Sequence, residues 1–210
     1  MANILTLIPM KPTLPAALVE SALRLLAALQ VEERRIGEHQ IEAHIEVCAE
    51  AGDDRPFSAH AAARNSLLDR HLQPHHTHVL WIDADLVEYP SDLATRLHVL
   101  NPAAIVAPFV LIENSDRFYD IYGFVDWEGR RASHAGAYLE GGDLVPMQSV
   151  GCCYLAPADV YRPARYAPTP GYTEHYSVCR LAQAWAARRV VVKHADLPKY
   201  GERWHIWREP

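Results

Sequence analysis

The feature that most constrains the fold is a short apolar run, His78-Val79-Leu80-Trp81-Ile82, that is followed directly by Asp83-Ala84-Asp85. Polar turns bound the run, and an apolar stretch of this length is typical of a strand buried on both faces of an α/β sheet. In such sheets, ligands bind in the crevice at the carboxyl ends of the strands. The sequence therefore predicts an α/β fold whose ligand site includes both aspartates.

The periodicity of the other segments agrees with this fold class. Apolar residues recur at helical spacing over residues 15–30, 58–71, 91–100 and 174–188, with Ser58 and Ser91 as expected N-caps. Strand patterns cover residues 3–8, 41–49, 78–82, 103–110, 149–155 and 190–192, and residues 113–147 are expected to form hairpins or a flexible substrate loop. The alternation of strands and helices, without a repeat or linker, predicts a single Rossmann-like domain with a mostly parallel central sheet flanked by helices.

Composition excludes several classes of protein. The 210 residues carry a formal net charge of -6, which argues against general nucleic-acid coating. The N-terminal apolar segment is short and followed by prolines, and no stretch reaches the roughly 18 apolar residues of a membrane span. The four cysteines are scattered, with Cys152 and Cys153 adjacent, which indicates reduced thiols in the core and a cytoplasmic location.

Asp83 and Asp85 carry the clearest chemical signal. Asp83 and Asp85 have one residue between them, and residues so spaced on an extended backbone share a side, so both carboxylates can face one cation. Their hard oxygen atoms suit Mg²⁺ or Mn²⁺, which usually also bind the oxygens of a substrate diphosphate. The alternative is a solvated turn that carries two acidic residues, but the preceding apolar strand favours a metal site.

Several features, in order along nearly the whole chain, resemble the glycosyltransferases of the GT-A fold. They are the strand 4–8, the helix with Ala63-Arg64-Asn65, the segment Leu80 to Asp85, the strand Val150 to Leu155, Gly171-Tyr172-Thr173-Glu174-His175 and a late His194. The phrase from Trp81 to Asp85, followed by Pro90, is similar to the fungal mannan-polymerase type, although the membrane anchor of its Golgi members is missing. The resemblance implies a single domain over residues 1–210. Residues 1–110 would be the nucleotide-binding half and residues 111–210 the acceptor and metal half.

The resemblance also implies a reaction, a cofactor and metal ligands. A sugar would move from a UDP- or GDP-sugar to an acceptor hydroxyl with the help of Mn²⁺ or Mg²⁺. Asp85 would bind the metal directly, while Asp83 would contact the sugar or ribose, or reach the metal through water. His194 would be a third ligand, with His205 as a competing candidate, and imidazole favours manganese.

Further roles follow from the same resemblance. Lys199 would contact the diphosphate, and Arg64 would lie near the nucleotide or diphosphate, unless it is a surface arginine. Glu174 would be the catalytic base, although His175 replaces the second acid that inverting enzymes usually have there. Gly151 would mark the close approach of the donor sugar to the backbone, or a bulge.

Two other functions stay open at this point. A haloacid-dehalogenase-type phosphatase also ends a strand in Asp-x-Asp, with Asp83 as nucleophile and Asp85 as acid/base, but the usual downstream acidic pair is missing. The second alternative is a domain that binds a nucleotide sugar without catalysing a reaction. The acceptor is also open: a glycan, lipid-linked sugar, protein, small molecule or modified DNA base. Aromatic side chains that would either stack on such an acceptor or pack an irregular region lie at positions 119, 122, 127, 138, 204 and 207. The segment His75-His76-Thr77-His78 is expected to be a solvated loop rather than a metal site.

Overall fold

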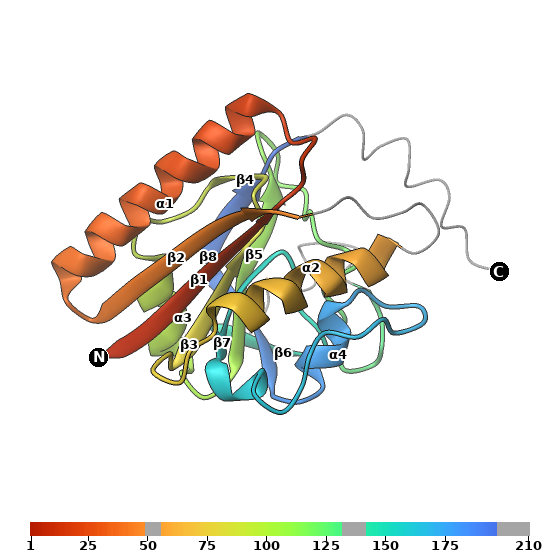
Figure 1. Ribbon diagram of the computed structural model, residues 1–210. Helices are drawn as coiled ribbons and strands as arrows, with labels where there is room; N and C mark the ends of the chain where they lie inside the picture. The colour runs from red at the N-terminus through yellow and green to blue at the C-terminus, as the bar shows by residue number, and fades with distance from the viewer. Residues whose placement is uncertain (49–55, 132–141, 197–210) are drawn as a thin grey trace.

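The computed structural model describes residues 1–48, 56–131 and 142–196 (Figure 1). One sheet runs through the molecule in the order β2-β1-β3-β7-β5-β8-β4, and β6 also pairs with β8. The strands are β1 (Ala2–Met10), β2 (His39–Val47), β3 (His78–Ile82), β4 (Leu86–Glu88), β5 (Ile105–Ile112), β6 (Leu144–Met147), β7 (Cys153–Pro157) and β8 (Ala184–His194). The helices are α1 (Ala16–Ile36), α2 (Pro56–His71), α3 (Leu93–Leu100) and α4 (His175–Cys179).

The predicted α/β class, with a central sheet flanked by helices, is confirmed. The sheet itself is mixed rather than mostly parallel. β1 is parallel to β2 and β3, and β5 is parallel to β8. β7, however, runs antiparallel between β3 and β5, and β4 and β6 are antiparallel to β8. Since β7 reverses direction between them, β3, β5 and β8 all point the same way and end at one edge of the sheet.

Helices cover both faces of the sheet. α1 packs against β2, β4 and α3, whereas α2 crosses the other face over β1 (Figure 1). The interior is filled by fully buried side chains such as Leu7, Trp81, Phe109 and Tyr154. No helix in the described part of the chain is both long enough and apolar enough to cross a lipid bilayer.

The helix boundaries differ from the predicted ones in three places. α1 continues six residues beyond Gln30 and stops at Gly37, which has φ 74° and donates its N–H to the Glu33 carbonyl. Ser58 lies inside α2 rather than capping it, because the helix begins at Pro56, a residue favoured at the first helical position. Ser91 is not the cap of α3 either, since Asp92 occupies that position.

The predicted helix over residues 174–188 is wrong in its second half. α4 ends at Cys179, and β8 begins at Ala184. The alanine-rich start of β8 has a high helix propensity, but it pairs with β5 on one side and β6 on the other. Tertiary pairing therefore overrides the local preference.

Irregular backbone surrounds β7. The predicted strand over 149–155 begins only at Cys153, because residues 150–152 form a sharp bend. The described part of 113–147 is hairpin-like, as predicted. It returns along β5 through the bridge Leu111–Phe118, and Val125 bridges to Arg131 and Ser149.

Candidate functional site

The carboxyl ends of three parallel strands bring the candidate residues together. Asp83 and Asp85 follow β3, Asp120 lies in the segment after β5, and His194 is the last residue of β8. The bend before β7 enters from the same edge, because Ile82 pairs with Cys153 and the Asp83 N–H donates to the Cys152 carbonyl. Residues far apart in the sequence thus share one edge of the sheet, where α/β folds bind ligands.

Asp85 and His194 form a buried pair. Their Oδ1 and Nε2 atoms are 3.0 Å apart, and the Ala195 N–H donates to the Asp85 carbonyl, which fixes the two backbones together. The other ring nitrogen of His194, Nδ1, donates to the Ala195 carbonyl at 2.8 Å. Tyr119 stacks on the imidazole with 3.5 Å between ring centroids. The ring of His194 therefore has a defined orientation with Nε2 aimed at Asp85.

Asp85 and His194 shift each other's pKa values toward the ionised forms. Burial alone would raise the pKa of Asp85, but the hydrogen bond and charge of His194 lower it below its usual value. Burial likewise disfavours protonated His194, yet Asp85 raises the net pKa of the imidazole. Each partner thus holds the other in its ionised form.

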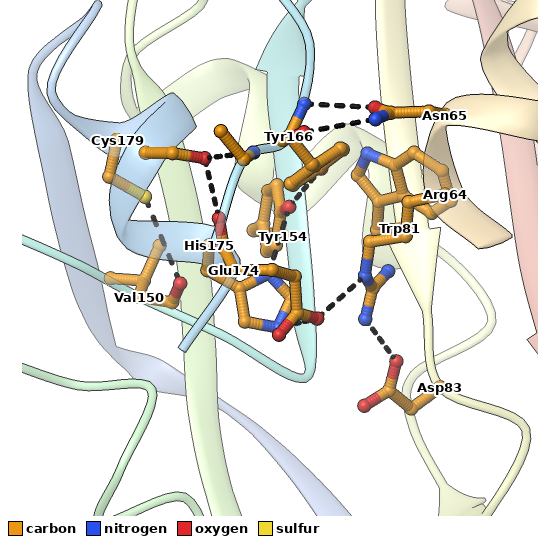
Figure 2. A network of polar contacts seen from close by, with 12 residues as sticks. Arg64, Asn65, Trp81, Asp83, Val150, Tyr154, Tyr166, Glu174, His175 and Cys179 are labelled. Atoms are coloured by element: carbon orange, nitrogen blue, oxygen red, sulfur yellow. Dashed lines mark hydrogen bonds and ion pairs between the residues drawn. The ribbon is translucent and has the colours of Figure 1, made fainter. Parts of the chain in front are cut away.

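Arg64 lies between two carboxylates, as Figure 2 shows. Its Nη2 donates to Asp83 Oδ1 at 2.8 Å and its Nε to Glu174 Oε1 at 3.2 Å. The guanidinium also lies over the ring of Trp81, 4.9 Å from its centroid. Arg64 is therefore not a surface arginine, and it links α2, the end of β3 and the start of α4.

Glu174 is held tightly in this network. Its side chain is 2% exposed, and Oε1 also lies 3.3 Å from His175 Nε2. Burial alone would raise the pKa of Glu174, but His175 and Arg64 lower it to about 2. Tyr154 contacts both His175 and Tyr166, so a buried aromatic layer lies beside the carboxylate (Figure 2). Glu174 is permanently ionised and enclosed at neutral pH.

The carboxylate of Asp83 turns toward Arg64, whereas that of Asp85 turns toward His194. Within the described residues, the only three side chains with ligand atoms all within 4.8 Å of one another are Glu42, His75 and His76. The structure thus joins two of the three predicted metal ligands, Asp85 and His194, and gives Asp83 a different partner.

The bend before β7 is strained at Cys152. This residue has φ 59°, and the Cys153 N–H returns to the Gly151 carbonyl at 2.6 Å, as in a γ-turn. A non-glycine residue rarely adopts this conformation, and such strain clusters at functional sites. Burial and the nearby carboxylates Asp83 and Asp120 raise the pKa of the Cys152 thiol, which agrees with the predicted reduced thiol in the core.

Asp120 is a site residue that the sequence reasoning missed. Its Oδ1 accepts the Gly123 N–H at 2.8 Å, and its Oδ2 lies against Gly151, where an added Cβ would come within 2.4 Å. Gly151 therefore provides room for the protein's own carboxylate. Burial, Asp83 and Glu174 raise the pKa of Asp120, and although Gly123 and His194 act in the opposite direction, it reaches about 7. The only sequence feature related to the position of Asp120 is the presence of glycine at 123 and 151. These two glycines meet at the Asp120 carboxylate only in the folded chain.

Other predicted contacts lie away from this edge or outside the described residues. Lys199 and His205 fall outside them, as do the aromatic residues at 138, 204 and 207. The Glu42–His75–His76 cluster lies on β2 and the loop before β3. There His76 Nδ1 accepts the Gln73 N–H, so Nε2 carries the proton and donates to Glu42 without a metal ion.

Comparisons with known proteins agree with this geometry. The Anp1 family model matches residues 54–145, less than half of the chain but including Arg64, both aspartates of the motif and Asp120. No curated protein matches the chain. Among solved structures, S. aureus TarS 1-349 is 10% identical, with a TM-score of 0.53, and the match covers 97% of this chain and 64% of that one. A mycobacterial protein is 13% identical, with a TM-score of 0.51, and the match covers 95% and 70% of the two chains.

The predicted resemblance to nucleotide-sugar-dependent glycosyltransferases of the GT-A fold, loosely of the mannan-polymerase type, is confirmed. At these identities the solved structures establish the fold alone. The chain also spans less than two thirds of the TarS fragment and 38% of the longer TarS structure, whose TM-score is 0.50.

Proposed function

We propose that the chain is a metal-dependent glycosyltransferase that moves a sugar from a nucleotide-diphosphate donor to an acceptor hydroxyl. The observation that carries the proposal is the Asp85–His194 pair, which lies at the ligand-binding edge of a GT-A fold with 3.0 Å between Oδ1 and Nε2. The diphosphate of a donor is anionic, and the chain itself carries a formal net charge of -6. A cation bound at this edge would therefore supply the positive charge that the donor needs.

The pair fits a divalent cation. Because Nδ1 of His194 donates to the Ala195 carbonyl, the lone pair of the neutral ring lies on Nε2, beside the Asp85 carboxylate. A ligating histidine commonly has its other ring nitrogen fixed in this way. Imidazole with carboxylate favours Mn²⁺, with Mg²⁺ as the alternative. The chemistry that such an ion supplies when bound is positive charge beside the departing diphosphate oxygen.

The residues of the chain position the donor. Arg64 holds one oxygen of Asp83 and leaves the other, in a side chain that is 29% exposed, for the ribose or sugar of the donor. We therefore assign Arg64 a positioning role, since Nε and Nη2 are already engaged by carboxylates. The contact of Lys199 with the diphosphate stays a prediction.

In this proposal, the two halves of the chain bind different parts of the substrates. Residues 1–110 supply Asp83 and Asp85 to the nucleotide, and residues 111–210 supply His194 and the acceptor side. Since the four cysteines are all free, a cytoplasmic location is the one we propose.

Calorimetric titration tests the function. UDP, GDP and their sugars are titrated into the protein with Mn²⁺, with Mg²⁺ and with EDTA. We expect one nucleotide diphosphate to bind only with metal, and Asp85→Asn to weaken its binding by about 100-fold or more, in line with the loss of a metal ligand. Because a proton competes with the metal for His194 Nε2, the affinity for the metal should fall as the pH is lowered, which titrations at several pH values will detect.

The matched control is Glu42→Gln, which changes another carboxylate–histidine pair, Glu42 with His76 at 3.2 Å, on a different part of the sheet. It should leave nucleotide binding unchanged. Hydrolysis of a generic phosphate ester without nucleotide binding would instead support the phosphatase hypothesis. Tight binding without transfer or hydrolysis would leave only the non-catalytic binding domain.

A further inference from the structure

Asp120 lies at the site because the segment after β5 folds back and pairs with the end of that strand. Leu111 bridges to Phe118, and the Tyr119 N–H donates to the Val110 carbonyl. Tyr119 then stacks on His194, so the next residue, Asp120, is anchored beside the proposed metal ligand. The segment that carries Asp120 belongs to the half of the chain assigned to the acceptor.

A notch made by two glycines receives the Asp120 carboxylate. A Cβ at Gly123 would lie 2.4 Å from Oδ2 and 2.6 Å from Oδ1, and a Cβ at Gly151 would lie 2.4 Å from Oδ2. Such distances do not occur between real atoms, so any side chain at either position would displace the carboxylate. Both glycines, from segments 28 positions apart, are therefore needed to seat one acidic group.

The two carboxylate oxygens of Asp120 have different surroundings. Oδ1 accepts the Gly123 N–H at 2.8 Å, which fixes the orientation of the group. Among the described residues, Oδ2 has neither a hydrogen-bond donor nor an ion-pair partner. A fixed carboxylate with one oxygen left over is the arrangement that can accept a proton from a bound hydroxyl.

Charge around Asp120 supports the same use. Asp83 and Glu174 repel a negative charge there, and together with burial they outweigh the stabilisation by the Gly123 N–H and by His194. The pKa of Asp120 is therefore raised, which makes its carboxylate a stronger base than an ordinary aspartate.

Glu174 lacks these properties. Both Arg64 and His175 contact its Oε1, and the side chain is 2% exposed. Removing it would leave Arg64 with a buried, partly unpaired charge. Its position therefore suits a structural role in holding Arg64.

We propose that Asp120, rather than Glu174, is the catalytic base of the transfer. In this step the acceptor oxygen bonds to the anomeric carbon of the donor sugar. The bond from that carbon to the diphosphate oxygen breaks, with its electron pair leaving on the diphosphate. The hydroxyl proton passes to Asp120 Oδ2, which becomes a neutral carboxylic acid. The inference rests on the proposed function.

The test uses water in place of the unidentified acceptor. Hydrolysis of UDP-glucose or GDP-mannose, whichever nucleotide the calorimetry selects, is followed as release of free sugar by the full chain. Asp120→Asn keeps an oxygen to accept the Gly123 N–H but cannot take a proton. We expect it to bind the nucleoside diphosphate with Mn²⁺ as the wild type does, yet to hydrolyse the donor about 10²-fold or more slowly.

A pH profile and one further variant separate a base from a structural group. The wild-type rate should fall as the pH drops below the pKa of the base, and this acidic limb should be absent from the residual rate of Asp120→Asn. Asp126→Asn changes a carboxylate in the same segment that accepts the backbone N–H groups of Glu128 and Arg130, and it should retain the wild-type rate and pH profile.

The outcomes distinguish this inference from the proposed function. If the wild type binds and hydrolyses the donor, and Asp120→Asn does so equally well while Glu174→Gln loses hydrolysis with binding intact, Asp120 is not the base. Binding without any hydrolysis by the wild type also overturns the inference but keeps the donor site. If no nucleotide diphosphate binds to the wild type, the proposed function itself fails.

Discussion

At Gly151, the absence of a methyl group decides how closely three segments approach. A Cβ there would lie 2.4 Å from Asp120 Oδ2, 3.0 Å from His175 Cδ2 and 3.1 Å from the Gly123 Cα. The last contact is with backbone, which cannot swing away as a flexible side chain can. Gly151 is therefore fixed by packing within the site.

We expect Gly151→Ala to destabilise the fold by about 1–3 kcal/mol, as overpacking does. For a chain of this size, each 1 kcal/mol corresponds to ~2–4 °C in the midpoint of thermal unfolding. Gly142→Ala is the control, because a Cβ at that exposed position meets nothing within 4 Å. Equal melting temperatures for the two variants would contradict the packing argument.

The sequence located some site residues and not others for a physical reason. Asp83 and Asp85 stand out because their signal is local, an acidic pair directly after an apolar strand. Asp120 follows no strand directly, and its seat needs Gly151 from a distant segment. The partnership of Arg64 with Glu174 joins residues 110 positions apart, so only folding reveals it.

On the scale of elements, the last turns of α1 serve to dock the helix on α3. Glu33 is fully buried, and its carboxylate accepts the Thr95 N–H at 2.9 Å and the Thr95 hydroxyl at 2.6 Å. The first of these satisfies a backbone donor in the first turn of α3. The extension of α1 beyond the predicted end at Gln30 makes this link.

Glu33→Ala should lower the free energy of unfolding by about 1–2 kcal/mol, because it leaves two partly buried donors of Thr95 without their acceptor. Glu20→Ala, at an exposed position on the same helix, should change it by less than about 0.5 kcal/mol. Urea unfolding followed by circular dichroism measures both. A similar small effect for the two variants would show that α1 and α3 are held by apolar packing alone.

The element predictions failed where pairing competes with propensity. The alanines at the start of β8 favour a helix in isolation, yet β5 and β6 flank them on both sides. The end of α1 was missed because residues 31–36 are mostly polar, although Gly37 marks the stop.

For the whole molecule, the edge of the sheet opposite the site carries a group of histidines. His39 and His78 begin β2 and β3, and their rings lie 4.6 Å and 4.8 Å from that of His98. Burial, with repulsion from the other two rings, lowers the pKa of His98 to about 4, and burial also lowers the pKa of His39 and His78. All three are therefore neutral in the folded protein at pH 7.

These histidines should make the protein acid-sensitive. Their pKa values lie below the unfolded value near 6.5, so the unfolded chain binds more protons as the pH falls toward 4. Stability is therefore retained above pH 6.5 and lost below it, by at most about 1.4 kcal/mol per pH unit for each group. In urea unfolding between pH 7.5 and 4.5, His98→Gln should lose less stability than the wild type. The same change at the exposed His75 should not, and parallel curves for His98→Gln and wild type would contradict the proposal.

The sequence by itself determined the α/β class, the central strand β3 and the acidic pair at its end, because these features depend on residues that are close together in the sequence. It also indicated His194 through order along the chain. Tertiary structure alone decided that β7 reverses between β3 and β5, and that Asp83 pairs with Arg64 while Asp85 pairs with His194. It likewise decided that two glycines seat Asp120. These features depend on contacts between segments far apart in the chain, where the free energy of packing and charge pairing outweighs local propensity.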